Sequence, residues 1–332
     1  MRNNITSQLI SKVNVEEELK SRIIGQNGAI EKIVPFIEVY NSGLSVPNRP
    51  AASFFITGPT GVGKTKLVET LAEIIHLDKK NVLFIDCGEY QMEHEVAKLI
   101  GAPPGYLGHR ETQPAITQQK LNAVKTDKSN LSIVLFDEVE KGAASLHRIL
   151  LGILDRGVLR LGDSGIVNFD NSIIFFTSNI GSHQMQKAMA GGYGFNSGRD
   201  TTKQVGLSEM KKKFPPEFIN RLDEILFFNS LTEKDIEGIL DLELNNIVEH
   251  IKKRYNENFE LFLTKNARMM LISESFSNES GARELKRVIQ KKILQPIAKL
   301  IIGEKDGEKQ FSLVIRDNEL VILREKEQTM SA

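Results

Sequence analysis

One eight-residue segment constrains the fold of this chain more than any other. It follows the pattern GxxxxGK[ST], in which glycine-rich backbone N–H groups surround a phosphate, the lysine balances its charge and the hydroxyl group binds Mg²⁺. The segment consists of Gly58, Pro59, Thr60, Gly61, Val62, Gly63, Lys64 and Thr65. Residues 52–57 (ASFFIT) predict a strand before it, and residues 64–76 predict a helix whose N-terminus faces the anion. The sequence therefore predicts a nucleoside triphosphate site, and a glycine-rich turn that binds nothing is the alternative.

Further apolar segments predict the sheet to which strand 52–57 belongs. We expect these strands at residues 81–87, 131–137, 172–178 and 224–229. Helical patterns alternate with the strands, and this alternation predicts a parallel sheet with both faces covered by helices. Residues 158–169 contain a Gly-Asp-Ser-Gly turn between two alternating runs and predict a β-hairpin.

The pattern changes to helices after residue 230, which predicts a second and smaller domain. Apolar residues recur at helical spacing from Ile236 to Ile251, after the capping residue type Thr232. Further helices are expected near residues 265–272 and 283–302, followed by two strands around Asp317-Asn318. The expected organisation is a short extension over residues 1–20, a large α/β domain over 21–230, a small domain over 231–325 and a disordered tail over 326–332.

Composition limits the classes of partner. Lys and Arg together number 43, as do Asp and Glu, so no general charge attracts nucleic acid or an anionic membrane. The N-terminal residues lack the pattern of a signal peptide, and no apolar run approaches the roughly 20 residues that a membrane helix needs. Cys87 is the single cysteine, which excludes an intramolecular disulfide, and we expect it to be buried. The sequence predicts a soluble, cytoplasmic protein with no nucleic-acid or membrane partner.

Polar residues follow two of the predicted strands. Asp137 and Glu138 end strand 131–137, where Asp137 would hold Mg²⁺ together with Thr65 and Glu138 would deprotonate the water that attacks ATP. Asn179 follows the next strand and would position that water if its strand lies beside the phosphate loop. The alternatives are two acids that merely end a strand and an asparagine that serves a turn.

Several longer motifs carry a resemblance to a known family. They are RIIGQ, GLSVPNRP, GAPPGYLG, LFDEVEK, FPPEFINRLDE and GARELKR. Together they resemble the second ATPase module of the Clp (hundred-kilodalton heat-shock) AAA+ proteins, such as ClpA, ClpB and ClpC, over nearly the whole chain. The resemblance implies a P-loop AAA+ domain, then a mostly helical lid domain with a terminal β-hairpin. Because only about 20 residues precede RIIGQ, we expect a stand-alone, single-ring form.

The resemblance also implies roles around the nucleotide. Ile23 and Ile24 resemble the pair that brackets the adenine ring, with core packing as the alternative for Ile23. Arg221 resembles the arginine finger that reaches ATP in the neighbouring subunit. Arg283 resembles the arginine through which the lid domain senses the nucleotide. Ala282, which precedes it, is expected to lie at the nucleotide as well. A surface salt bridge is the alternative for either arginine.

Two segments with aromatic residues resemble sites for other proteins. Tyr106 and Leu107 resemble the pore loop that grips a translocated chain, whereas a tyrosine in a turn is the alternative. The hairpin turn near Asp163 matches a second pore loop. Tyr193, Gly194 and Phe195 resemble the loop with which ClpC docks into the ClpP peptidase, although tyrosine replaces an aliphatic residue; a locally packed surface loop is the alternative.

The expected function is an ATP- and Mg²⁺-dependent unfoldase that threads polypeptide through the pore of a homohexamer. An ATPase partner of a ClpP-like peptidase is the alternative within the family. A nucleic-acid motor or clamp loader is disfavoured by the balanced charge. A scaffold that uses ATP only to assemble is disfavoured by the complete set of catalytic residue types.

Overall fold

The computed structural model describes most of the 332-residue chain. The described residues are 14–101, 114–182, 184, 198–254, 259–275, 281–302, 310–316 and 319–324. The chain divides into two compact units; the main change lies between Asn229 and Ser230, and Thr60–Val62 are grouped with the second unit. Each unit has its own hydrophobic core.

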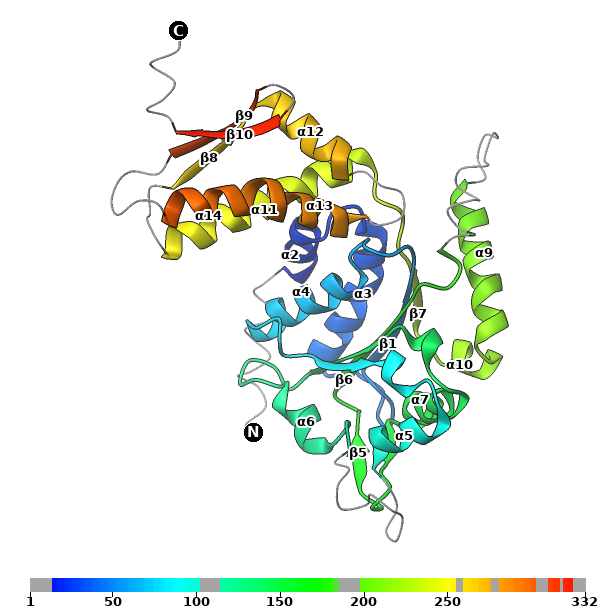
Figure 1. Ribbon diagram of the computed structural model, residues 1–332. Coiled ribbons are helices and arrows are strands. Elements are labelled where there is room, and N and C mark those ends of the chain that lie inside the picture. Colours follow the sequence, from blue (N-terminus) through cyan, green and yellow to red (C-terminus); the bar gives the residue numbers. More distant parts are fainter. Residues whose placement is uncertain are drawn as a thin grey trace. The chain divides into compact units, whose positions relative to one another are not determined.

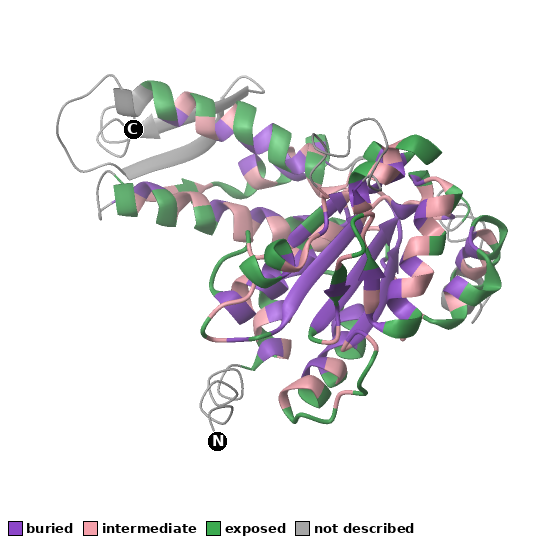
Figure 2. Ribbon diagram, turned by 90° about the horizontal axis from the view of Figure 1, so that it is seen from below, coloured by how far each residue is buried: buried purple, intermediate pink, exposed green. Residues whose placement is uncertain are grey.

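A parallel five-stranded sheet forms the centre of the first unit (Figure 1). Its order is β2-β3-β6-β1-β7. The strands are β1 (Ala52–Thr57), β2 (Leu83–Asp86), β3 (Ser132–Asp137), β6 (Ser172–Ser178) and β7 (Glu224–Phe227). Every residue of β1 and β6 is buried, as expected for central parallel strands covered on both faces (Figure 2).

Helices cover both faces of this sheet (Figure 1). One face carries α2 (Val15–Arg22), α3 (Asn27–Asn41) and α4 (Lys64–His76). The other carries α5 (Glu93–Ile100), α7 (Ala144–Arg156) and α10 (Pro216–Asn220), and the unit also contains α6 (Gln118–Ala123) and α9 (Gly198–Lys213). A short hairpin pairs β4 (Val158–Arg160) with β5 (Ile166–Asn168), as the sequence predicts.

Several boundaries in this unit differ from the sequence prediction: β2 covers residues 83–86 rather than 81–87, β3 begins at 132 rather than 131, and β7 ends at 227 rather than 229. Strand β2 ends at Asp86, because that side chain accepts a 2.7 Å hydrogen bond from the N–H of Gly88 and caps the 3₁₀ turn Cys87–Tyr90. Helix α2 begins at Val15, inside the segment expected to be an extension, and its Leu19 is fully buried. The extension therefore contributes apolar surface to the first unit.

The second unit is mostly helical. Its helices are α11 (Glu233–Arg254), α12 (Lys265–Ser275), α13 (Ala282–Ile289) and α14 (Gln295–Ile302). Thr232 caps α11, since its hydroxyl accepts from the N–H of Asp235 (3.2 Å) while Asp235 accepts from the N–H of Thr232 (2.8 Å). The helix expected over 283–302 contains a π-helical segment, Gln290–Leu294, between α13 and α14.

A small sheet completes the second unit. The predicted terminal hairpin is present as β9 (Gln310–Arg316) and β10 (Glu319–Arg324). Strand β8 (Glu260–Leu263), which the sequence analysis did not predict, pairs in parallel with β9. The predicted fold class, a parallel-sheet α/β domain followed by a smaller helical domain with a terminal hairpin, is confirmed. Among the described residues, no helix combines the length and apolar character needed to cross a membrane.

Candidate ATP site

The glycine-rich loop joins β1 to α4. Gly63 caps α4 with a φ of 100°, a conformation that favours glycine, and a Cβ built there would meet nothing within 4 Å. Gly58 serves a close approach instead, because an added Cβ would lie 2.5 Å from the carbonyl oxygen of Phe228. The first turn of α4 thus presents backbone N–H groups beside open space, which suits a phosphate.

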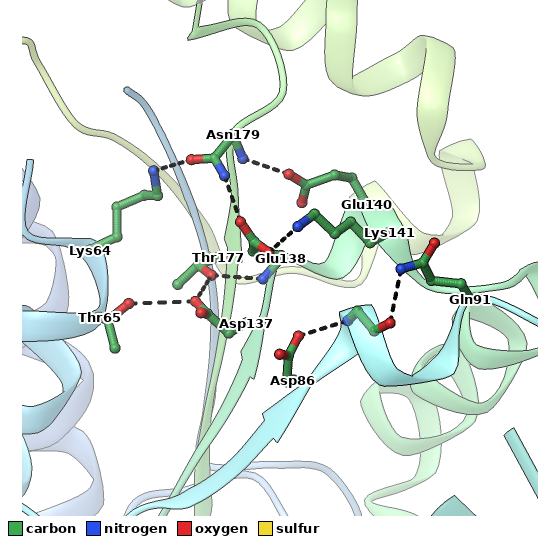
Figure 3. Close-up of polar contacts among 11 residues, drawn as sticks. Lys64, Thr65, Asp86, Gln91, Asp137, Glu138, Glu140, Lys141, Thr177 and Asn179 are labelled. Atoms are coloured by element: carbon green, nitrogen blue, oxygen red, sulfur yellow. Dashed lines mark hydrogen bonds and ion pairs between the residues drawn. The ribbon is translucent and has the colours of Figure 1, made fainter. Parts of the chain in front are cut away.

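Lys64 spans from this loop to the neighbouring strand (Figure 3). Its Nζ donates to the carbonyl oxygens of Gly58 (2.6 Å) and Pro59 (2.8 Å). It also donates to Oδ1 of Asn179 (2.7 Å), directly after β6. Because β6 pairs with β1, the condition under which Asn179 could serve the phosphate loop is met.

The carboxylate of Asp137 lies across from the loop hydroxyl. Thr65 Oγ1 is 3.5 Å from Asp137 Oδ1, at the outer limit of a hydrogen bond. A hydroxyl and a carboxylate are the hard oxygen ligands that Mg²⁺ prefers, usually with several waters kept. The pair therefore fits the predicted metal ion by its donor chemistry.

Glu138 is held in an unusual backbone conformation. Its φ is 52°, in the left-handed region, which costs a residue other than glycine of order 1–3 kcal/mol. Its Oε1 accepts from Asn179 Nδ2 (3.1 Å), and its Oε2 pairs with Lys141 (Figure 3). The strained turn and these two contacts direct the carboxylate towards Asn179.

Two residues that the sequence analysis missed complete this network. Thr177 is buried in β6, where its hydroxyl donates to the carboxylate of Asp137 and accepts from the N–H of Glu138 (3.0 Å). Glu140 accepts from the N–H of Asn179 (2.9 Å). A polar residue near the end of an apolar strand was the available signal for Thr177, but its partners come from another strand.

Arg221 follows α10 and has a partner within its own subunit. Its Nη2 lies 2.9 Å from Asp155 Oδ1 of α7, and the two side chains are 54% and 38% exposed. An ion pair this exposed contributes at most about 1 kcal/mol, so the guanidinium can be withdrawn from it at little cost. The structure thus places Arg221 at an accessible position.

Comparisons with known proteins assign the family. A model described as "AAA domain (Cdc48 subfamily)" matches residues 49–225, which include the loop, Asp137, Glu138 and Arg221. The chain belongs to this AAA family. As an AAA domain it binds nucleotide, and residues 231–311 match the "C-terminal, D2-small domain, of ClpB protein".

Individual relatives of this AAA protein are Clp proteins. It is 35% identical over 300 residues to the ATP-dependent Clp protease ATP-binding subunit ClpC of Staphylococcus epidermidis, covering 90% of this chain and 35% of that protein. For ClpC of Staphylococcus aureus strain USA300, identity is 36% over 293 residues, covering 87% and 35%. The chain thus spans about a third of the length of these relatives.

Solved structures agree with this relationship. Hsp104 with ATPγS and FITC casein superimposes with a TM-score of 0.80 and 30% identity, over 95% of this chain and 52% of that one. The Saccharomyces cerevisiae Hsp104–casein complex gives 0.80 and 29%, over 96% and 54%. The predicted resemblance to a Clp-type ATPase module is confirmed.

The remaining predicted site residues of the AAA protein lie in several places. Ile23, at the end of α2, is 3% exposed, which suits the packing alternative, whereas Ile24 is half-buried. Ala282 and Arg283 begin α13 in the second unit. Tyr106 and Leu107, and likewise the segment Tyr193, Gly194 and Phe195, lie outside the described residues.

Cys87 is buried, as the sequence predicts. Burial raises the pKa of its thiol, with nearby carboxylates adding in the same direction, so little thiolate forms at neutral pH. The cysteine therefore packs as a small apolar residue.

Thr177→Val tests the buried hydroxyl. The substitution keeps the shape of the side chain but removes hydrogen bonds to Asp137 and Glu138, so we expect the free energy of unfolding to fall by about 1–3 kcal/mol. Chemical denaturation of the full chain measures this, with Thr177→Ser as the matched control that keeps the hydroxyl. Equal stability of the valine and serine variants would contradict the structural role.

Proposed function

We propose that this AAA protein is an ATP-driven protein-remodelling motor of the Clp type. Its subunits form a homohexamer, in the cytoplasm, that threads polypeptide past Tyr106 through a central pore. The observation that supports hydrolysis is the network at the ends of three adjacent strands, in which Asn179 contacts both Lys64 and Glu138. This arrangement gathers a cation, a carboxylate and an amide beside the loop.

The roles in hydrolysis follow from these contacts. Lys64 exchanges its bonds to loop carbonyl oxygens for phosphate oxygens of ATP, and the N–H groups of α4 bind the same phosphates. Bound Mg²⁺, held by Thr65 and Asp137, would supply charge neutralisation on the phosphates. Glu138 accepts the proton of the attacking water, and Asn179 orients that water by its amide.

Further residues complete the proposed cycle. Arg221 reaches the ATP of the neighbouring subunit, which makes hydrolysis depend on assembly. Ile24 contacts the adenine, whereas the burial of Ile23 favours its packing alternative, and Ala282 and Arg283 respond to the nucleotide from the small domain. In this way hydrolysis is coupled to movement of a bound polypeptide.

A second candidate is partnership with a ClpP-like peptidase. It is favoured by the similarity to ClpC, which is named as a subunit of a Clp protease. Tyr193, Gly194 and Phe195 would form the docking loop. Copurification of a peptidase with the ATP-bound protein, lost in a Phe195→Ala variant, would support this candidate.

Tyr106→Ala tests threading. The aromatic ring of Tyr106 would grip any passing chain by apolar contact. We therefore expect loss of this side chain to abolish ATP-dependent unfolding of a tagged fluorescent protein, while ATPase activity stays within about threefold of wild type. Tyr106→Phe, which keeps the ring, should retain unfolding. Unfolding by the alanine variant at the wild-type rate would refute the pore role.

A further inference from the structure

His147 lies behind the turn that carries Glu138, on α7, and has no part in the chemistry proposed above. Its Nε2 is 3.0 Å from the carbonyl oxygen of Val139. Val139 is fully buried and begins the 3₁₀ turn Val139–Lys141, directly after Glu138. His147 therefore contacts the backbone that sets the direction of the catalytic carboxylate.

The direction of this hydrogen bond is fixed by chemistry. A carbonyl oxygen only accepts, so the ring must donate through Nε2–H. Burial lowers the pKa of His147, and the positive charge of Lys213 lowers it further. The hydrogen bond to Val139 acts in the opposite direction. The imidazole is thus neutral at pH 7, in the tautomer that carries its proton on Nε2.

The same ring packs against the segment that leads to Arg221. Its centroid lies 5.0 Å from that of Phe214, at an interplanar angle of 62°, and 6.4 Å from that of Phe218. Phe218 belongs to α10, and its carbonyl oxygen accepts from the N–H of Arg221 (3.2 Å). His147 thus touches both the turn of Glu138 and the support of Arg221.

The phenylalanines behind His147 are anchored to the central sheet. Phe214 packs edge-on against Phe55 of β1 at 5.3 Å, and Phe218 against Phe176 of β6 at 5.4 Å. Phe214 and Phe218 also stack on each other at 5.3 Å. Packed aromatic rings of this kind move together rather than independently, so displacement of one is passed to its neighbours.

We infer that His147 is a positioning residue that fixes the turn of Glu138 against the aromatic support of Arg221. Through it, each subunit's own hydrolytic turn is coupled to the arginine that it offers to the next site. A shift of the Val139 carbonyl moves the ring, and the ring moves Phe214 and Phe218. This inference rests on the proposed function, in which Arg221 serves a neighbouring subunit.

Three substitutions of the full chain separate the hydrogen bond from the packing. His147→Phe keeps a ring but removes the donor, His147→Gln keeps an N–H donor without the ring, and His147→Ala removes both. For His147→Phe we expect kcat to fall about threefold to tenfold, the value of one lost hydrogen bond, with the Kd for ATP unchanged. For His147→Gln we expect kcat to recover to within about twofold of wild type.

The dependence of the ATPase rate on ATP concentration tests the coupling. We expect a Hill coefficient above one for the wild type and close to one for His147→Phe and His147→Ala, in rings whose size is verified by sedimentation. Wild-type kcat and Hill coefficient in His147→Phe would overturn the inference while leaving the proposed function intact. A kcat in His147→Gln as low as that in His147→Phe would overturn it too, because the N–H donor to Val139 would then not restore the rate. A wild-type chain without ATPase activity would instead refute the proposed function.

Discussion

Arg221→Ala lowers the kcat of ATP hydrolysis about 10³–10⁵-fold, the contribution of an arginine finger in related phosphate-loop systems. The Kd for ATP stays at the wild-type value, because the phosphate loop and the Asp137–Glu138 turn of the same subunit are untouched. In the structure, Arg221 pairs with Asp155 through an exposed contact that an incoming phosphate can replace. Steady-state hydrolysis and equilibrium binding of a fluorescent ATP analogue measure the two quantities.

Mixed rings show whether this arginine acts between subunits. Arg221→Ala lacks the finger and Lys64→Ala lacks the phosphate lysine, so each variant alone is inactive. When the two are mixed, some sites combine an intact loop with an intact finger, and part of the activity returns. Asp155→Asn is the matched control, since it removes only the partner of Arg221 and should retain hydrolysis. Weaker ATP binding by isolated Arg221→Ala subunits would show that the arginine serves its own site.

Glu138→Gln lowers kcat about 10²–10⁴-fold, the usual contribution of a general base. The amide is nearly isosteric, keeps an acceptor for Asn179 and cannot take up the proton of water. ATP binding is retained. A hexamer that binds ATP without hydrolysing it is expected to keep its polypeptide substrate bound. Hydrolysis is followed by phosphate release, and retained polypeptide and any peptidase are identified by capture of the tagged variant.

A matched variant separates the base from its surroundings. Glu140→Gln alters the neighbouring carboxylate, whose Oε1 accepts from the N–H of Asn179, and should lower kcat far less. Rapid hydrolysis by Glu138→Gln would exclude this residue as the base. Capture of nucleic acid rather than protein would instead support the alternative motor class.

Local pattern explains what the sequence could predict. The strand 52–57, the helix 64–76 and the strand 172–178 have the predicted bounds, because burial on both faces or helical spacing is readable within each segment. Strand β8 was missed because its pairing with β9 joins segments far apart in the chain. Strand order, likewise a tertiary property, decides that Asn179 lies beside Lys64.

The sequence predicted the residues that take part in the chemistry, but not the residues that hold them in position. Lys64, Asp137 and Glu138 follow short motifs whose chemistry dictates residue type. Thr177 and His147 act through contacts with other elements, and nothing in their immediate sequence indicates a partner. The roles of Arg283 and Tyr106 stay predictions.

Three of the hydrogen-bond acceptors of Lys64 bear on nucleotide exchange. Two of them are carbonyl oxygens of the glycine-rich loop itself, and the third is the amide of Asn179. Under the proposed function, these hydrogen bonds of Lys64 would stabilise the conformation of the glycine-rich loop between product release and ATP binding. Binding of the next ATP would then exchange hydrogen bonds of Lys64 and would not require the loop to refold. The conformation of the site would be kept from one turnover to the next.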